Sequence, residues 1–418
     1  MLIIKSILIE GIWGYKTINC KLQRNVNIII GKNGVGKTTV LNLISSVINV
    51  DIEALCKVSF DRLLLDFYED ENPQKEISFE VKRYAKNGQP TISYDFKEIK
   101  ITKQTFRNEI SNNITRYALK HAIQNYINLT WLSINRKNLR RYHREGDEPS
   151  EIDKRLEELF INMQDYYYRL MSRSMELNEE FKSNVINIFL YDKDIDMPTK
   201  ESLEQIKEEN INKDDLISMF SSLGLSDKEI KERIETHFDM IQKAKKETLL
   251  AESPTLDSTN SLNDSSAKII SLYLRTRGML NAYHRFQERT EENYALLKKF
   301  LKLLADFMPD KKFSLSSETD GKLQIKVSLG TEEYELNYKE LSSGEKQILI
   351  LLTEALLQQG KEYIYLADEP EMSLHMNWQE IIISAITQLN DKAQIIVATH
   401  SPEIAQDWSN KIIDLNLL

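Results

Sequence analysis

Cysteine is scarce in this chain, which has only Cys20 and Cys56 among its 418 residues. The two lie far apart, and neither belongs to a C-x-x-C pair. A paired-cysteine zinc site and a disulfide framework are therefore excluded. Because such low cysteine usage is typical of proteins in a reducing compartment, we expect a cytoplasmic protein.

Long hydrophobic runs are also missing. The longest, Ile348–Leu352, is far too short to cross a bilayer. The first ten residues carry Lys5 and Glu10 within a short apolar stretch, which predicts a strand and not a signal peptide. We therefore expect no contact with a membrane.

Basic residues are outnumbered, with 55 against 64 acidic residues and a net charge of −9. An acidic protein does not bind nucleic acid without sequence preference unless it carries a local basic patch. Hydrophobic residues make up 41% of the chain and charged residues 28%, which is typical of a folded globular protein. The length predicts two or three domains.

Both ends of the chain predict an α/β architecture. Residues 26–30, 363–367 and 395–399 are continuous apolar strands that alternate with helical patterns, which indicates a parallel sheet buried on both faces. A further apolar strand is predicted near 127–134. Residues 58–68, 75–84 and 90–96 are rich in Val, Ile, Phe and Tyr, with Asn-Pro and Asn-Gly breaks between them, which predicts an antiparallel meander.

The middle of the chain predicts helices. Apolar residues spaced by three and four indicate long helices near 151–190 and 267–307. A projecting coiled-coil-like hairpin and an ordinary helical subdomain both fit this pattern. We therefore expect one α/β domain built from residues 1–149 and 309–418, with a large α-helical insertion at 150–308.

Residues 31–38 match the phosphate-loop pattern G-x-x-x-x-G-K-[ST]. A predicted strand precedes them and a predicted helix follows, which favours a P-loop NTPase over a simple glycine turn. The glycines let the backbone wrap phosphates, while Lys37 can neutralise the β and γ oxygens and Thr38 can ligate Mg²⁺. We expect ATP and Mg²⁺ as ligands, with nucleotide contacts from Gly31, Lys32, Asn33, Gly34, Gly36, Lys37, Thr38 and Thr39.

A second candidate element is the buried strand 363–367, which ends in Asp368 and Glu369. Asp368 is placed to hold the hydrated Mg²⁺, and Glu369 is placed to polarise the attacking water. Solvated carboxylates at a strand end are the plain alternative. The phosphate loop in the same chain favours the functional interpretation.

The segment Leu341-Ser-Ser-Gly-Glu-Lys-Gln347 precedes an apolar helix and, taken alone, is a good helix N-cap. Its position just before the carboxylate strand resembles the ABC ATPases, whose signature is similar to L-S-G-G-Q. The resemblance implies an ABC-type nucleotide-binding domain that works as an ATP-sandwich dimer, in which the signature of one subunit reaches the γ-phosphate bound by the other. It assigns nucleotide contacts to Ser342, Ser343, Gly344 and Glu345, although Ser343 replaces a glycine of the family.

His400 follows the last apolar strand, within Ala398-Thr-His-Ser-Pro402. It resembles the switch histidine of the ABC family, which reaches the γ-phosphate. A lone histidine is more often structural, but a position just past a parallel strand is where such sheets bind ligands. We expect Lys37, Glu369 and His400 to be the catalytic residues.

Two departures from transporter-type ABC proteins narrow the resemblance. His375 stands where the family has an aspartate, and Asn135-Arg136 stands where a metal-sensing glutamine should follow a strand. That glutamine is unassigned, and Gln89 and Gln104 are only guesses. Both departures resemble the RecF- and OLD-like branch, the "AAA family" ATPases of prokaryotic defence systems, in which D-E-P-E-x-S-L-H, L-S-S-G-E and T-H-S-P occur together.

This branch implies an ATP-driven switch in antiviral defence, as in the PARIS, Septu and retron-associated ATPases. Its partner would be a separately encoded effector, such as a nuclease. We expect no nuclease domain after His400, which separates the chain from single-chain OLD nucleases. Whether the protein forms an assembly larger than a dimer stays open.

Two further features each allow two interpretations. Trp13 or Tyr15 either stacks on adenine, as an aromatic residue does in ABC proteins, or is buried in the core. The basic patch Arg136–Arg144, which includes Tyr142, either contacts nucleic acid or phosphate, or is a solvated loop or a binding edge. The second interpretation of the patch is favoured.

Two rival functions fit the same motifs. In the first, the protein is a scaffold in which ATP is mainly structural, and it would hold ATP with negligible turnover. In the second, it is a RecF- or SMC-like DNA repair factor, and DNA should stimulate its hydrolysis. An ATP-hydrolysing defence switch is the leading hypothesis.

Overall fold

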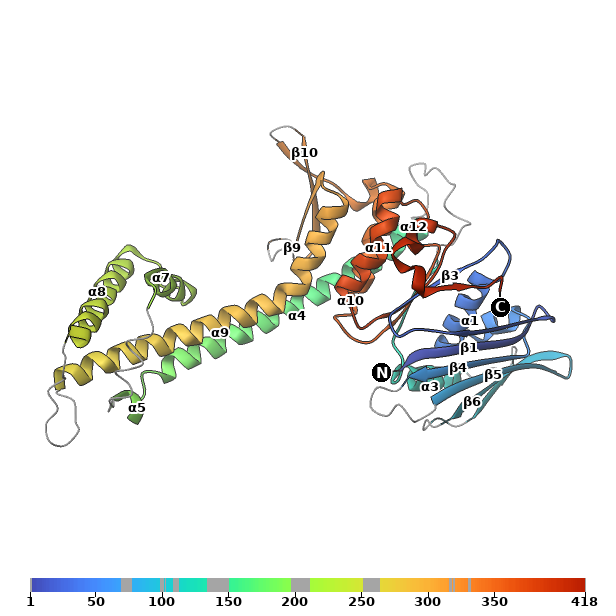
Figure 1. The fold of residues 1–418 in the computed structure, drawn as a ribbon, viewed down its shortest axis with the longest axis horizontal. Helices are drawn as coiled ribbons and strands as arrows, with labels where there is room; N and C mark the ends of the chain where they lie inside the picture. Colours follow the sequence, from blue (N-terminus) through green and yellow to red (C-terminus); the bar gives the residue numbers. More distant parts are fainter. Residues whose placement is uncertain are drawn as a thin grey trace. The chain divides into compact units, whose positions relative to one another are not determined.

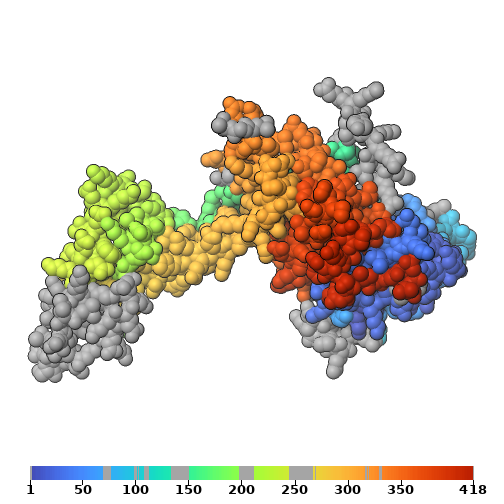
Figure 2. Space-filling view, turned by 45° about the horizontal axis from the view of Figure 1, so that its top comes forward, coloured from blue at the N-terminus to red at the C-terminus, as the bar shows by residue number. Residues whose placement is uncertain are grey.

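The computed structural model describes residues 2–68, 77–97, 101, 103–107, 113–133, 150–196, 211–250, 264–315, 318, 320–329 and 332–417. The chain divides into two compact units. Unit 1 is formed by Met1–Tyr167 together with Leu296–Leu418, and unit 2 by Tyr168–Ala295. The first and last thirds of the chain thus fold together, and in Figure 2 the blue N-terminal and red C-terminal segments pack against each other.

The parallel sheet of unit 1 has five strands in the order β14-β3-β13-β12-β8. Its strands are β3 (Val26–Ile30), β8 (Leu129–Ser133), β12 (Ile364–Asp368), β13 (Gln394–Ala398) and β14 (Ile412–Asp414). All residues of β12 and β13 are buried, as expected for continuous apolar strands between two layers. Ala398 pairs with Asp368 on one side and with Ile29 on the other. The carboxyl ends of three strands therefore meet at one edge of the sheet.

Helix α1 (Lys37–Asn49) leaves the phosphate loop after β3. The apolar residues that predicted this helix are all at most 1% exposed, namely Val40, Leu41, Ile44, Val47 and Ile48. They belong to the main hydrophobic core, which also includes residues of both large sheets. The helix that begins at the phosphate loop is thus anchored along its whole apolar face.

A six-stranded antiparallel sheet, in the order β2-β1-β4-β5-β6-β7, contributes the other side of this core. The predicted meander is confirmed, because β4, β5 and β6 pair antiparallel in sequence order. The Tyr94 hydroxyl in this sheet donates a 3.2 Å hydrogen bond to the carbonyl of Val47 in α1. The strands are β1 (Ile3–Ile12), β2 (Lys16–Lys21), β4 (Arg62–Tyr68), β5 (Ile77–Lys86), β6 (Gln89–Lys97) and β7 (Gln104–Arg107).

Smaller elements complete unit 1 (Figure 1). A three-stranded antiparallel sheet has the order β11-β10-β9, and it precedes the apolar helix α10 (Ser343–Leu357) in the chain. The sheet consists of β9 (Lys311–Leu315), β10 (Leu323–Leu329) and β11 (Glu332–Glu335). The remaining helices are α2 (Ile52–Lys57), α3 (Asn113–Gln124), α11 (Met376–Leu389) and α12 (Pro402–Ala405), with short 3₁₀ turns at Tyr338–Glu340 and Gln406–Lys411.

Two ion pairs tie the first turns of α4 (Glu151–Asn187) to α10. Lys346 Nζ lies 2.8 Å from Asp153 Oδ1, and both side chains are at most 13% exposed. Arg155 pairs with Glu354, whose side chain is 9% exposed. Burial raises the pKa of the Glu354 carboxyl, and the Arg155 charge lowers it part of the way back. Helix α10, which begins in the signature segment, is thus bound by ion pairs to the first turns of α4.

Removing the partner of the buried Glu354 gives a pH-dependent prediction. Arg155→Ala should destabilise the protein at neutral pH by about 1–3 kcal/mol, because a buried carboxylate loses its counter-charge while Arg155 itself is partly exposed. Since the pKa of Glu354 in the folded protein lies above its unfolded value, the loss should shrink as acidification protonates the carboxyl. Unfolding midpoints in urea between pH 7 and pH 5 measure this.

The exposed pair Arg173–Glu176 supplies the matched control. Arg173→Ala should change the midpoint little at any of these pH values, because an exposed ion pair contributes about 0–1 kcal/mol. Adding Glu354→Gln to the Arg155→Ala variant should flatten its pH dependence. A loss that grew on acidification would contradict the assignment to Glu354.

Unit 2 is helical and contains most of α4 and of α9 (Asp264–Phe307), which run side by side (Figure 1). The Phe181 and Phe286 rings stack between them, with centroids 5.0 Å apart. Shorter helices follow the predicted pattern, namely α5 (Lys193–Asp196), α7 (Lys213–Ser222) and α8 (Lys228–Leu250). Unit 2 is shorter than the expected insertion of 150–308, because the first turns of α4 and the last turns of α9 belong to unit 1.

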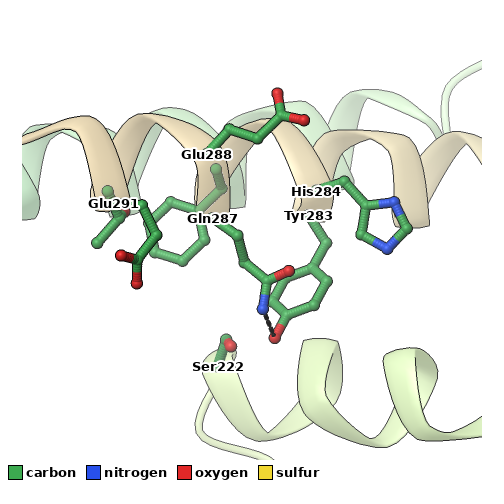
Figure 3. Close-up of a pocket in the computed structure, with 8 residues that line it drawn as sticks. Ser222, Tyr283, His284, Gln287, Glu288 and Glu291 are labelled. Atoms are coloured by element: carbon green, nitrogen blue, oxygen red, sulfur yellow. Dashed lines mark hydrogen bonds between the residues drawn. The ribbon is translucent and has the colours of Figure 1, made fainter. Parts of the chain in front are cut away.

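An open hollow of about 660 Å³ lies beside α9 within unit 2 (Figure 3). The Gln287 amide donates a 2.7 Å hydrogen bond to the Tyr283 hydroxyl, and both side chains extend toward Ser222 at the end of α7. Among the helices in the described part of the chain, none is long and apolar enough to span a bilayer.

Candidate nucleotide site

The phosphate loop connects β3 to α1 and requires glycine at several positions. Gly34 and Gly36 have φ of 81° and 111°, a region that side chains with a Cβ rarely adopt. Gly36 is the N-cap of α1 and offers no side chain to cap the helix. The amide groups at the start of α1 therefore point toward a site suited to an anion, and the helix dipole adds to the attraction.

Lys37 begins α1 and is only 5% exposed. Its Nζ donates a 2.9 Å hydrogen bond to the Gly31 carbonyl and lies 2.6 Å from His400 Nε2. Because an ammonium group only donates, the imidazole nitrogen accepts this bond. The predicted lysine and switch histidine, which are 363 positions apart in the sequence, thus meet at one point.

Thr38 and Asp368 face each other across the sheet edge. The Thr38 hydroxyl donates a 3.1 Å hydrogen bond to Asp368 Oδ1. Asp368 is the last residue of β12 and is 9% exposed. The described residues include no group of three or more His, Cys, Asp or Glu side chains placed to hold a metal. A metal at this pair would therefore take its other ligands from water and phosphate, which Mg²⁺ prefers.

Glu369 follows Asp368 directly and has a left-handed backbone, with φ of 48°. Its amide donates a 2.8 Å hydrogen bond to the Ala398 carbonyl, which fixes the turn against β13. Its Oε1 lies 3.9 Å from His400 Nε2, and the side chain is 14% exposed. The structure thus brings Glu369, His400 and Lys37 together, as the sequence predicts.

The signature segment is held at the start of α10 by a different set of contacts. Ser342 caps the helix, and Glu345 accepts from the Ser342 amide at 2.8 Å, which forms a capping box. Lys311 Nζ lies 2.6 Å from Glu345 Oε1. Burial tends to raise the pKa of Glu345, but hydrogen bonds from Lys311 and Ser342 outweigh it and lower the pKa. Nucleotide contact by Glu345 stays a prediction, since its carboxylate caps its own helix and pairs with Lys311 in this structure.

Gly344 is buried where the signature meets the loop after β12. A Cβ at this position would lie 2.5 Å from the Ser373 carbonyl oxygen and 3.3 Å from the Trp378 ring. The glycine is therefore required by packing within its own chain. Ser342 and Ser343, by contrast, are exposed.

The two aromatic residues of the β1–β2 turn are not core residues. Trp13 is 39% exposed and Tyr15 is 80% exposed, with ring centroids 6.3 Å apart. A Cβ at Gly36 would lie 3.0 Å from the Trp13 ring. Burial in the core is thus wrong for both residues, because the turn places Trp13 beside the phosphate loop. Stacking of an aromatic residue on adenine stays a prediction.

The other predicted residues fall outside this constellation. Lys32, Asn33 and Gly34 are exposed on the phosphate loop, and Thr39 is half-buried in α1. His375 is exposed at the N-cap of α11. The two guesses for the missing glutamine, Gln89 and Gln104, begin β6 and β7 in the antiparallel sheet. The basic patch 136–144 and the Asn135-Arg136 segment lie outside the described residues.

Sequence reasoning missed two residues that hold the site. Glu371 Oε1 accepts a 2.6 Å hydrogen bond from the Thr399 hydroxyl and a 3.0 Å bond from the His400 amide. The two missed residues are Glu371 and Thr399, which belong to the motifs D-E-P-E and T-H-S-P. The motifs were recognised in the sequence, but a contact between residues 28 positions apart could not be predicted from them.

Three comparisons with known proteins found similarities to this chain. The Septu protein PtuA of Bacillus thuringiensis is 38% identical over 105 residues, which cover 22% of this chain and 26% of PtuA. The chain therefore matches about a quarter of the length of that curated relative. The Smc head domain with an extended coiled coil, bound to the C-terminal domain of ScpA and derived from Pyrococcus furiosus, is 16% identical with a TM-score of 0.46. It is matched over 99% of this chain and 93% of that one.

The Smc head domain with a coiled coil and joint from Pyrococcus yayanosii is 15% identical with a TM-score of 0.44, over 99% of this chain and 95% of that one. The AAA ATPase domain family matches residues 2–405. This match spans nearly the whole chain, and the phosphate loop, the parallel sheet and the helical unit agree with it. The chain therefore belongs to the AAA ATPase domain family, and it combines a P-loop α/β nucleotide-binding domain with a helical insertion.

Proposed function

We propose that this protein binds and hydrolyses ATP as a dimeric molecular switch in an antiviral defence system, and that it controls a separately encoded effector. The observation that carries the chemical part is the convergence of Lys37, Glu369 and His400 beside the Thr38–Asp368 pair. A cation, a general base and a metal-binding pair at a helix N-terminus are what phosphoryl transfer from a nucleotide to water requires.

The residues present fit ATP and Mg²⁺. The loop glycines leave the backbone open, since a Cβ at Gly34 would meet no atom within 4 Å. Lys37 is placed for the β- and γ-phosphates, and Thr38 with Asp368 would hold Mg²⁺ directly or through water. When bound, Mg²⁺ would neutralise charge on the phosphate oxygens.

Glu369 is the general base of this proposal. Its carboxylate directly follows the fully buried strand β12, where it can orient a water molecule and accept its proton. His400 would stabilise charge on the γ-phosphate, because its Nε2 already lies near both Lys37 and Glu369. The three side chains would act on the nucleotide held by their own phosphate loop.

A second copy of the chain would complete the site. Ser342 and Ser343 are exposed at the N-terminus of α10, where the helix dipole attracts a negative group. Gly344 is already covered by its own chain, so the contact with a partner's nucleotide would fall to the two serines. Nucleotide binding would then close two copies on each other, and hydrolysis would open them.

The effector would dock on unit 2. The catalytic constellation supplies chemistry for the nucleotide alone, and the nucleotide-binding surfaces are needed for dimer closure. Unit 2 carries three consecutive exposed apolar residues just after α4, namely Phe189, Leu190 and Tyr191, each at least 63% exposed. Exposed aromatic and aliphatic side chains of this kind are typical anchors of a protein interface. The similarity to the Septu protein PtuA supports a defence role.

Co-expression with the product of a neighbouring gene tests this proposal. Replacing Phe189, Leu190 and Tyr191 by serine should abolish co-purification of the effector and protection against phage, while ATP binding is retained. Lys37→Ala should leave co-purification intact and still abolish protection, because the nucleotide-driven step is lost.

The control is the double variant Ile114→Ser and Tyr117→Ser on α3, where both side chains are more than 70% exposed. It should neither break the complex nor reduce protection. If the protein protected cells without a partner, or protected equally with Lys37→Ala, the proposal of a nucleotide-driven defence switch that controls a separate effector would fail.

A further inference from the structure

We propose that Glu371 is a positioning residue, which ties the loop after β12 to the loop after β13 and so holds His400 and Glu369 toward the same phosphate. The proposal rests on the hydrolysis proposed above. Its basis is one carboxylate oxygen, Glu371 Oε1, that accepts from both the Thr399 hydroxyl at 2.6 Å and the His400 amide at 3.0 Å.

The Thr399 side of this link is buried and has a further hydrogen bond. Thr399 is fully buried, and its hydroxyl oxygen accepts a 2.9 Å hydrogen bond from the Ser401 amide. The backbone of His400 is therefore held on both sides, through its own amide and through the residue that follows it. Because the backbone is fixed, the His400 imidazole starts from a defined point when it reaches Lys37.

The loop that carries Glu371 has an unfavourable conformation. Glu369 and Ser373, which flank it at two positions on either side, have φ of 48° and 69°. Non-glycine residues adopt this region at a cost, and such residues persist only when their surroundings hold them. Glu371 supplies two of the bonds that hold the loop, and the Glu369 amide supplies a third to the Ala398 carbonyl.

The two oxygens of Glu371 differ in their contacts. Oε2 is buried and has no hydrogen-bond partner among the described residues, so Oε1 alone makes the link. Both of its bonds go to the segment that carries the switch histidine, which points to alignment of that residue.

The test compares turnover with nucleotide affinity in the full-length protein. Glu371→Ala should lower kcat for ATP about tenfold or more, because small displacements of catalytic groups have large effects on rate. The Kd for a fluorescent ATP analogue should change less than about threefold, because Lys37 and the phosphate loop are untouched. Glu371→Gln should recover most of kcat, since the amide oxygen can accept both bonds.

A double-mutant cycle with His400→Ala decides whether Glu371 acts through the histidine. If it does, Glu371→Ala should cause little further loss in the His400→Ala background. Glu380→Ala on the exposed face of α11 is the matched control and should leave kcat unchanged. Full additivity of the two losses, or a kcat of Glu371→Ala within about twofold of wild type, would overturn the proposal.

Thr399 keeps the proposal testable if Glu371→Ala does not fold. Thr399→Val removes the hydroxyl at similar volume and should lower kcat, whereas Thr399→Ser keeps the hydroxyl and should not. Equal kcat in these two variants would overturn the proposal. A wild-type protein without turnover would instead defeat the proposed function, so the two failures are distinguishable.

Discussion

Replacing Glu369 with glutamine is expected to lower ATP turnover by about 10²–10⁴-fold while ATP binding stays near the wild-type level. The amide cannot accept a proton from water, but it has the same size, and the phosphate loop is unchanged. The turn at Glu369, with its amide bonded to Ala398, should persist because that bond uses the backbone. Phosphate release measures kcat, and a fluorescent ATP analogue measures Kd.

The same variant should accumulate a closed dimer with ATP, which size-exclusion chromatography can detect. Glu380→Gln, at an exposed position on α11, is the control and should behave as wild type. Turnover of Glu369→Gln within a few-fold of wild type would show that another group activates the water.

The second large effect concerns the composite site. Lys37→Ala should remove phosphate binding in each copy, and Ser343→Asp should place a carboxylate against the triphosphate of the partner copy. Each homodimer should therefore be inactive. A mixed dimer has one site with both changes and one with neither, so mixing equal amounts should restore roughly a quarter of wild-type turnover if one intact site suffices.

Ser343 is a better position for this change than Gly344. Any side chain at Gly344 would displace the Ser373 carbonyl of its own chain, whereas an aspartate in the first turn of α10 is favoured by the helix dipole. Ser343→Asn, which has the size of aspartate without its charge, should lose much less turnover than Ser343→Asp. Mixed dimers that form but remain inactive would count against a site shared between two copies.

Much of the site could be predicted because its parts are local patterns. The phosphate loop and its helix combine glycines with an apolar stripe, and that stripe is buried as predicted. Asp368, Glu369 and His400 could be placed together because parallel strands bring their carboxyl ends to one edge.

The missed features depend on contacts between distant segments. Three such contacts are the Glu371–Thr399 bond, the Lys311–Glu345 pair and the packing of Gly344 on Ser373. Each joins segments whose proximity cannot be predicted from the spacing of apolar residues. Whether Trp13 is buried or exposed could not be predicted from the sequence either, since a turn between two strands can face the core or the site. Its position beside Gly36 follows from how the turn folds.

The contact between Lys37 Nζ and His400 Nε2 has a consequence for product release under the proposed function. A bound triphosphate would draw Lys37 toward its phosphate oxygens, and its γ-phosphate can bind both side chains. A diphosphate has no group for the histidine, which is free to return to the lysine and compete with the β-phosphate for it. The histidine would thereby weaken retention of ADP after each turnover, so His400→Ala should show tighter product inhibition than wild type.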